Sequence, residues 1–398
     1  MRYLLVLLAL SITGLSNGQS LVYGLYTDAN APYNGYSILA TIDAGTGTIL
    51  EKDTIYGYDA VALGSSSFDQ LSGNYIYVAA GNQSFDLLSR NVYTNTTVSS
   101  PPSTMTANAL QFDMASGQTY ALGYDMSTGT TFLSIDVTTG TATVVSSLAQ
   151  VDAVVLGASC FDPMDGIFYF IGISTDFQSK LFGVDAQSGQ LVMDITMDLG
   201  PNEYLNELEY DIEGDVFYAL HRTGSGIMHF AQIDPVSGQI FDLLDITGNV
   251  NYFTPDASVY EQENDQFIML TVSPNTILTI DADEGEVLSQ APISYSIIEL
   301  EVDNVDFANA QFVSVAEYER ESLDLFPNPS DGRLFISSPT QYLENTPYLI
   351  RDNTGAIVAR GSLNPESSAD VQELKNGSYI ISVQGESGVY AAPFLIQR

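Results

Sequence analysis

One stretch of the chain decides its fold, and it reads Phe161-Asp162-Pro163-Met164-Asp165-Gly166-Ile167-Phe168-Tyr169-Phe170-Ile171. An aromatic residue and an acid come first, a turn follows, and a short apolar strand ends the stretch. Further along the same unit lies a second marker, a hydrophobic residue and an aspartate with a glycine four positions later, Val184-Asp185 to Gly189. Together the two markers predict a unit of about four short antiparallel strands.

Both markers recur along the chain. The aromatic-acid pairs are separated by 44, 49, 49 and 50 residues, and a degenerate sixth copy is Val302-Asp303. The five pairs are Phe68-Asp69, Phe112-Asp113, Phe161-Asp162, Tyr210-Asp211 and Tyr260-Glu261. The second marker recurs as Ile42-Asp43 to Gly47, Ile135-Asp136 to Gly140, Val184-Asp185 to Gly189, Ile233-Asp234 to Gly238 and Ile280-Asp281 to Gly285, with a worn copy at Arg90-Asn91 to Asn95.

Turn chemistry explains the second marker. An aspartate side chain accepts hydrogen bonds from the amides just after it, and glycine takes the left-handed conformation that turns the chain back. Asparagine can replace both residues, so the worn copy still predicts a turn. We therefore interpret these aspartates as structural residues and not as ligands.

A period near 49 residues with about four strands is typical of a β-propeller blade. The sequence predicts an all-β protein with a six-bladed propeller over residues 19–318. Its first blade is split, because Leu21–Thr27, Ser37–Asp43 and Thr48–Thr54 supply three strands while Ile298–Asp303 returns from the far end as the innermost one. Five or seven blades are the alternatives if the stretch 308–316 pairs differently. The architecture loosely resembles secreted propellers of the YVTN or NHL type, and that resemblance implies no activity.

The last 76 residues differ in character from the repeats. They contain Leu325-Phe326-Pro327-Asn328-Pro329-Ser330-Asp331-Gly332 and, later, Gly377-Ser378-Tyr379-Ile380-Ile381. The two prolines favour extended neighbours, and Asp331-Gly332 supplies a turn before the next strand. The residues alone predict a small immunoglobulin-like β-sandwich.

This layout resembles the C-terminal sorting domain of the type IX (Por) secretion system of Bacteroidota. The resemblance rests on Pro327, Asn328, Pro329, Gly332, Gly377 and Tyr379 and covers residues 323–398. It implies contact with the secretion machinery, translocation across the outer membrane, removal of the domain, and attachment to surface lipopolysaccharide as a further outcome. A small sandwich appended for another purpose is the alternative.

The N-terminus fits the same route. Met1-Arg2 is a short basic start, Tyr3–Leu10 is apolar, and Ser16-Asn17-Gly18 offers small residues for cleavage, so residues 1–18 are predicted to be a Sec signal peptide. Residues 319–322 form the expected linker before the sorting domain at 323–398. We expect no transmembrane anchor, since no other apolar run is long enough to span a bilayer. The single cysteine, Cys160, excludes an internal disulfide and is interpreted as a small buried residue.

Charge narrows the choice of partners. The chain has 49 acidic and 11 basic residues, a formal net charge of −38. Such a surface repels nucleic-acid phosphates and anionic lipids, so we expect no nucleic-acid partner. An acidic surface of this kind would also keep a secreted protein soluble in salty surroundings.

Candidate ligand positions follow from the propeller geometry, because loops entering the innermost strands converge on one face of the channel. We predict a polar rim at the channel mouth, and the alternative is that its members cap turns. The rim consists of Asp59, Asn108, Asp152, Asn206 and Asp256.

Few groups of residues in the sequence have a spacing typical of a catalytic site, and the sequence predicts no catalytic residue, metal site or cofactor. His221 and His229 flank one turn, but no third ligand has a recognisable spacing, so they are expected to be solvated loop residues.

Two functional classes remain. We favour a secreted or cell-surface binding and adhesion propeller whose ligand is a glycan, a protein or another surface partner. The alternative is an extracellular polymer-degrading hydrolase or lyase with carboxylates at the channel mouth. A purely structural surface-layer component is a third possibility.

Overall fold

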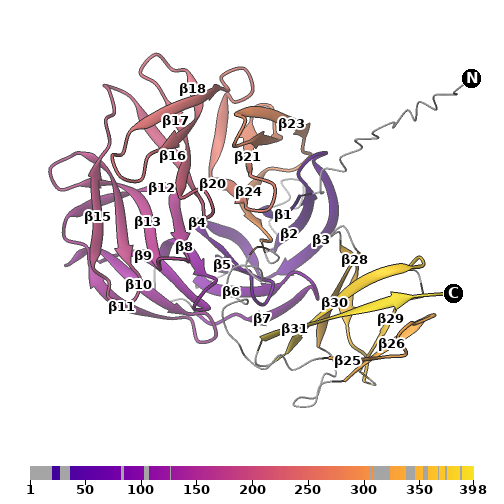
Figure 1. Ribbon diagram of the computed structural model, residues 1–398. Helices are drawn as coiled ribbons and strands as arrows, with labels where there is room; N and C mark the ends of the chain where they lie inside the picture. The colour runs from indigo at the N-terminus through magenta and orange to yellow at the C-terminus, as the bar shows by residue number, and fades with distance from the viewer. Residues whose placement is uncertain are drawn as a thin grey trace, which may run out of the picture.

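The structure is a computed structural model, and Figure 1 shows a ring of sheets beside a smaller yellow domain. It describes residues 20–26, 36–81, 85–102, 107–125, 127–304, 307, 323–337, 346–352, 357–365, 367–372, 374–385 and 388–398. The predicted signal peptide at 1–18, the stretch 308–316 and the linker at 319–322 lie outside the described residues.

The repeat markers form the turns that the sequence predicts. Asp69 Oδ1 accepts hydrogen bonds from the N–H groups of Leu71 and Ser72, both at 3.0 Å. Gly73 has a φ of 69° and donates its N–H to the Asp69 carbonyl at 2.8 Å. In the worn copy, Asn91 Oδ1 takes the role of the aspartate, and Asn95 takes the left-handed position with a φ of 55°. The aspartates and asparagines of these turns therefore act as structural residues.

Within the described residues, the repeats form six four-stranded sheets, which are the blades of a propeller. Blades 1 to 3, each written outward from the channel, are β24 (Ile297–Val302), β1 (Leu21–Tyr26), β2 (Tyr36–Asp43), β3 (Thr48–Tyr56); β4 (Tyr58–Asp69), β5 (Asn74–Gly81), β6 (Phe85–Asn91), β7 (Thr96–Ser99); and β8 (Ala107–Asp113), β9 (Gln118–Asp125), β10 (Gly129–Asp136), β11 (Thr141–Ser147). Blades 4 to 6 are β12 (Val151–Asp162), β13 (Ile167–Ser174), β14 (Ser179–Asp185), β15 (Leu191–Thr196); β16 (Tyr204–Asp211), β17 (Val216–Arg222), β18 (Met228–Ile233), β19 (Ile240–Asp245); and β20 (Tyr252–Glu261), β21 (Gln266–Val272), β22 (Thr276–Asp281), β23 (Glu286–Pro292). The prediction of six blades is confirmed.

Blade 1 closes the ring with strands from both ends of the propeller. β24 pairs antiparallel with β1, so that Val302 lies opposite Val22 and Leu300 opposite Gly24. β24 also contacts the innermost strands β20 and β4 of its two neighbours. The predicted split blade is therefore present, and the pairing of β24 with β1 completes its four-stranded sheet.

Apolar side chains fill the spaces between blades. Between blades 5 and 6, Tyr218 stacks on Phe230 and on Tyr260, with ring centroids 5.1 Å and 5.5 Å apart. Phe267 of blade 6 belongs to the same buried cluster. Because each such cluster joins two blades, burial of apolar area holds the blades to one another as well as within themselves.

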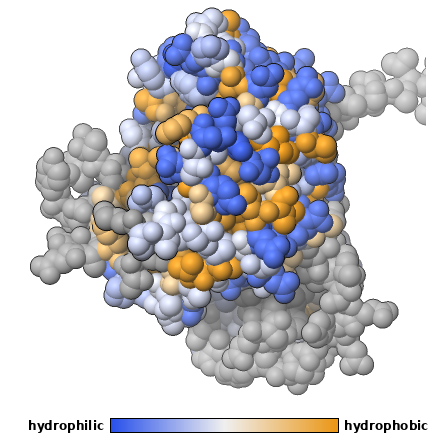
Figure 2. All heavy atoms as spheres, turned by 90° about the vertical axis from the view of Figure 1, so that its left-hand side faces the viewer, coloured by the Kyte–Doolittle hydropathy of each residue, from blue (hydrophilic) through white to orange (hydrophobic). Residues whose placement is uncertain are grey.

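The outermost strands meet solvent. Side chains of β15 alternate between half-buried and exposed, as expected for a strand with one wet face. Figure 2 shows hydrophobic residues interspersed with hydrophilic ones on this side of the ring. Scattered exposed apolar residues of this kind are ordinary surface features.

The innermost strands follow two alternating designs. Val61 and Ser66 of β4 are five residues apart, but their partners in β5, Ala79 and Tyr77, are two residues apart. β4 therefore has three extra residues, which form a bulge. β12 and β20 have the same three-residue bulge. β8, β16 and β24 have one extra residue each. The blades therefore come in three pairs with pseudo-threefold symmetry.

Side-chain amides join the blades where the innermost strands end. Each of three amides donates its N–H₂ to a carbonyl of the preceding blade and accepts an N–H from the same segment, over 2.6–3.1 Å. The amides and their backbone partners are Gln70 with Val302 and Asn304, Asn304 with Tyr260 and Gln262, and Gln262 with Tyr210 and Ile212. Elsewhere at this end Met114 packs with Phe112 and Phe307. These contacts join neighbouring blades at this end of the channel.

The C-terminal domain contains two sheets. In spatial order, the strands of the first sheet are β25 (Asp324–Phe326), β26 (Arg333–Ser337) and β29 (Ser368–Asp370). Those of the second sheet are β28 (Ile357–Ser362), β27 (Pro347–Asp352), β30 (Gly377–Gly385) and β31 (Gly388–Ile396). One core of buried side chains, among them Leu334, Ile350 and Phe394, lies between the sheets. The predicted small β-sandwich is confirmed.

The predicted sorting motif fastens the start of this domain to its end. The Asn328 side chain accepts the Leu395 N–H at 2.9 Å and donates to the Pro393 carbonyl at 3.3 Å. Tyr379 donates its hydroxyl to the Lys375 carbonyl at 2.8 Å. These motif residues therefore have a structural role in the fold of the domain.

Replacing Asn304 by alanine should lower the free energy of unfolding by about 2 kcal/mol, because it leaves the buried Gln262 N–H and Tyr260 carbonyl without partners. Urea unfolding of the full chain, followed by tyrosine fluorescence, measures this effect. The exposed Asn251, which also donates to a carbonyl, is a matched control, and Asn251→Ala should cost less than about 0.5 kcal/mol. Equal losses in the two variants would contradict this role of Asn304.

Candidate ligand site in the central channel

The channel mouth is the end at which the innermost strands enter. Three loops converge here, each from a three-residue bulge. Two of the loops contain a glycine with a left-handed backbone, Gly64 (φ 71°) and Gly157 (φ 72°). A Cβ atom on Gly157 would lie 2.3 Å from the Asp256 nitrogen, and one on Gly64 would lie 2.4 Å from Leu156 Cδ1. Glycine is required at both positions because the three loops touch near the axis.

Asp256 occupies the third equivalent position with a φ of 64°. This conformation is uncommon for a residue with a side chain, although aspartate tolerates it better than most residues. Its N–H donates to Glu207 Oε1 at 3.1 Å, and the Gly64 N–H donates to Glu299 Oε1 at 3.0 Å. The left-handed residues thus direct their amides at two glutamates of neighbouring blades.

Glu207, Asp256 and Glu299 are called here the mouth carboxylates. Glu207 is 1% exposed and Glu299 is fully buried. Burial raises the pKa of all three groups. The charge of Asp256 raises the pKa of Glu207 and Glu299 further. A carboxyl–carboxylate hydrogen bond joins Glu299 to Asp256, while no N–H or other O–H of the described residues donates to Glu207 Oε2 or Glu299 Oε2.

Below the mouth lies a cavity of about 100 Å³, large enough for several water molecules. Glu209 and Glu301, called here the cavity carboxylates, line it. Ser258 donates to Glu209 Oε1 at 2.7 Å, and Ser66 donates to Glu301 Oε1 at 2.8 Å. At the third equivalent position Gln111 donates instead, to the Ser159 carbonyl at 3.0 Å and the Ser159 hydroxyl at 3.2 Å.

Burial also raises the pKa values of the cavity carboxylates. The pKa of Glu209 rises to about 8, and that of Glu301 rises well above its ordinary value. Asp256 adds to both shifts through its charge. Both groups line the cavity, so each can exchange a proton with water there or meet a bound cation.

No basic side chain balances these acids among the described residues of the propeller. The four lysines and arginines there have partners outside the channel. The pairs are Lys52 with Tyr295, Arg90 with Asp53, Lys180 with Asp194, and Arg222 with Tyr204. The channel is therefore a strongly electronegative site that either holds protons or attracts a positively charged group.

The predicted rim residues separate in the structure. Asp256 enters the channel, whereas Asn206 is half-buried and Asn108 and Asp152 are exposed. Asp59 belongs to β4, but its side chain lies outside the described residues. Asp152 lies at a register shift between Val151 and Ala153, ahead of the three-residue bulge of β12. Ligand contact at these residues stays a prediction.

Sequence reasoning missed the four glutamates. A signal was present, because Glu207-Leu208-Glu209 and Glu299-Leu300-Glu301 are identical triplets that directly precede Tyr210 and Val302 in the repeat. In a strand, such glutamates share one face, and that face points into the channel here. Cys160 is buried, as predicted, and its burial raises the pKa of its thiol.

Comparison with known proteins supports the division into two parts. Residues 324–397 match the family model described as the secretion system C-terminal sorting domain. The predicted sorting domain is thus confirmed, and it directs the chain through type IX secretion to the cell surface or beyond. No protein of curated function matches the sequence. Among the described residues, no helix is both long and apolar enough to cross a membrane.

Solved structures resemble the propeller in fold. TolB from Acinetobacter baumannii has a TM-score of 0.53 at 12% identity, covering 71% of this chain and 66% of its own, slightly less than two thirds. A chain of the nidogen/laminin complex has a TM-score of 0.50 at 10% identity, covering 72% of this chain and 99% of its own. Identities this low show the β-propeller fold alone.

Replacing Glu209 by glutamine should flatten the pH dependence of stability. Because its pKa is raised from 4.5 to about 8 in the folded chain, the folded state holds the proton more tightly, and stability falls as pH rises between these values. Glu209→Gln keeps an acceptor for Ser258, and glutamine occupies the equivalent position 111. We expect the variant to be more stable than the wild type at pH 8 and to lose less stability between pH 5 and 8.

Urea unfolding across this pH range measures the slopes. Glu284→Gln, which removes an exposed acid, is the control and should keep the wild-type slope. A wild-type slope in Glu209→Gln as well would show that Glu209 does not titrate in this range.

Proposed function

We propose that this chain is a secreted or cell-surface binding protein whose propeller holds a positively charged group of its ligand at the mouth carboxylates. Export by the type IX route is the premise, since the C-terminal domain is a sorting domain. The propeller then meets its partner outside the cell. The single observation that carries the proposal is the cluster of buried carboxylates at the mouth, in which Glu207 Oε2 and Glu299 Oε2 receive no N–H and no hydroxyl donor from the described residues.

Electrostatics supports a cationic ligand group. An isolated buried carboxylate is costly, and the cost falls when the group is protonated or when a cation lies beside it. Asp256 brings a third acid to the same point, which strengthens the field. A divalent cation, or an ammonium or guanidinium group of a peptide or amine, would offset the charge of all three.

The geometry supports a fixed site. Backbone amides of Asp256 and Gly64 hold one oxygen of each glutamate, so the other oxygen is oriented before a ligand arrives. Such preorganisation reduces the entropy lost on binding. The leucine side chains at the same loops, Leu63 and Leu156, would pack against the apolar part of an organic ligand.

Replacing Glu207 and Glu299 together by glutamine should abolish stabilisation by cationic probes. The probes are Ca²⁺ and a lysine-containing hexapeptide, each titrated against the full chain while the thermal midpoint is recorded at pH 8. The wild type should gain several degrees with at least one probe at saturation, because a ligand that binds only the folded state stabilises it. The double variant should gain none.

Glu284→Gln again serves as the matched control and should respond as the wild type does. The two probes distinguish a metal ion from an organic cation. No shift with either probe, or an equal shift in the double variant, would refute the site. Turnover of polysaccharides by the wild type that the double variant lacks would instead favour the hydrolase or lyase.

Deleting residues 323–398 should leave the propeller folded and stop its secretion. The deletion removes the sorting domain but none of the six blades. We expect the shortened protein in the periplasm of the native host, found by fractionation and immunoblotting. Fusing residues 323–398 to a periplasmic reporter provides the reciprocal control and should export the reporter. Normal secretion of the shortened chain would contradict the assignment.

A further inference from the structure

The two histidines of the chain lie next to each other in blade 5. His221 belongs to β17 and His229 to β18, and the two residues are direct partners in the antiparallel register. His221 is only 7% exposed. The expectation of solvated loop histidines is therefore wrong, because both residues lie in strands that flank the turn.

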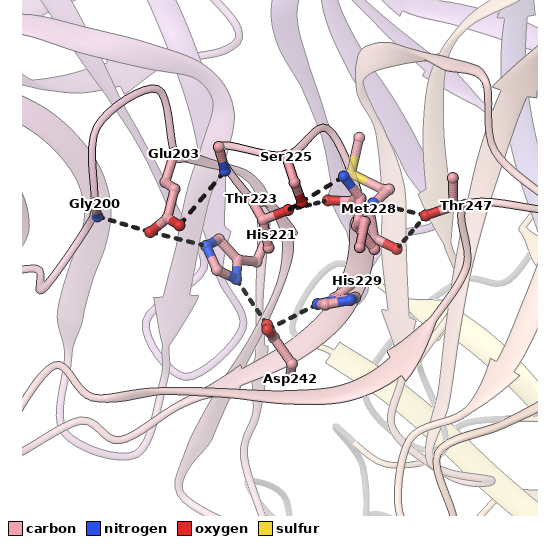
Figure 3. Close-up of polar contacts among 11 residues, drawn as sticks. Gly200, Glu203, His221, Thr223, Ser225, Met228, His229, Asp242 and Thr247 are labelled. Atoms are coloured by element: carbon pink, nitrogen blue, oxygen red, sulfur yellow. Dashed lines mark hydrogen bonds and ion pairs between the residues drawn. The ribbon is translucent and has the colours of Figure 1, made fainter.

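A third side chain joins them from β19. The register between β18 and β19 shifts by one residue: Phe230 pairs with Leu244, but the next residue of β18, Ala231, pairs with Asp242. Leu243 is the extra residue, and this bulge places Asp242 on the face that carries both histidines. Figure 3 shows the Asp242 carboxylate between the two rings. No spacing in the sequence reveals such a bulge.

The ligand atoms converge on one point. Asp242 Oδ1 lies 2.7 Å from His221 Nδ1, and Asp242 Oδ2 lies 2.7 Å from His229 Nδ1. One ligand atom from each of the three residues can be chosen so that all lie within 4.8 Å of one another. His229 Nδ1 is buried and makes no hydrogen bond of normal geometry, despite the nearby carboxylate. At 2.7 Å from a carboxylate oxygen, this nitrogen carries a proton in the metal-free chain, and a cation would bind it by displacing that proton.

Glu203 lies on the other side of the His221 ring. Its Oε2 is 3.9 Å from His221 Nε2, which is buried and has no hydrogen-bond partner. The Gly200 N–H holds the same carboxylate at 2.7 Å. A histidine that binds a metal through Nδ1 carries its proton on Nε2, and a carboxylate is its usual partner there. Glu203 is positioned for that role.

We propose that His221, His229 and Asp242 bind a divalent transition metal ion of the Zn²⁺ class, with Glu203 orienting His221. Two imidazoles and a carboxylate are typical zinc ligands, at about 2.0–2.2 Å from the metal, so on binding the two carboxylate–imidazole contacts would lengthen and any wider separation between ligand atoms would shorten. Three protein ligands leave a coordination position for water or a partner. The Asp242 side chain is 35% exposed, so an ion can enter from solvent.

The site is separate from the channel and does not depend on the proposed ligand there. The ligands come from β17, β18 and β19, whereas the channel is lined by the innermost strands. A metal ion would link three strands of one blade and add stability at its outer half.

Titrating the full chain with Zn²⁺ by calorimetry, and with Co²⁺ by visible absorption, tests the proposal. We expect one ion per chain and the intense d–d absorption of a tetrahedral cobalt site. His229→Gln and Asp242→Asn should each weaken Zn²⁺ binding at least about tenfold, and Glu203→Gln should weaken it about tenfold through His221.

Asp245→Asn is the matched control, because Asp245 lies opposite His229 in the register and is not one of the proposed ligands. It should bind Zn²⁺ within about threefold of the wild type. Near-ultraviolet circular dichroism checks that each variant is folded. No stoichiometric binding by the wild type, or unchanged affinity in folded His229→Gln and Asp242→Asn, would overturn the proposal and leave a hydrogen-bonded cluster.

Discussion

The hydrogen bonds between β24 and β1 determine both the ring and the channel. They join residues near position 300 to residues near position 22, and β24 contacts the innermost strands β20 and β4 of the two neighbouring blades. β24 also contributes Glu299 and Glu301, one mouth carboxylate and one cavity carboxylate. Closure and site formation are therefore one event. The backbone amide of Gly64 and the hydroxyl of Ser66, both from β4, then meet these two glutamates across the blade boundary.

The channel acids act against this closure. Their pKa values rise because burial penalises charge, and the lysines and arginines of the described propeller lie elsewhere. The fold compensates by burying aromatic clusters between blades and by the amide contacts of Gln70, Gln262 and Asn304. Stabilisation at one end of the channel thus permits an unfavourable arrangement at the other. Such local departures from good packing chemistry are usual at functional sites.

Much of the fold could be predicted from turn chemistry. Asp69 with Gly73, and Asn91 with Asn95, form the turns that their side chains favour, so the blade count and the split blade followed from spacing. The site could be predicted only in part. Asp256 of the predicted rim lies in the channel and Asp152 is exposed, and strand pairing decides this difference, because a three-residue bulge sets where β12 meets the axis. Asp242 was missed for a similar reason, since the bulge at Leu243 depends on strand pairing and not on local sequence.

The position of the closing strand also bears on quality control during synthesis. A ribosome reaches the sorting domain only after β24 has been made. A chain that ends early therefore lacks its sorting domain together with the strand that closes the ring, and we expect it to remain in the periplasm. Only a chain that includes all strands of the propeller also includes the sorting domain, so the order of these segments couples export to a complete propeller sequence.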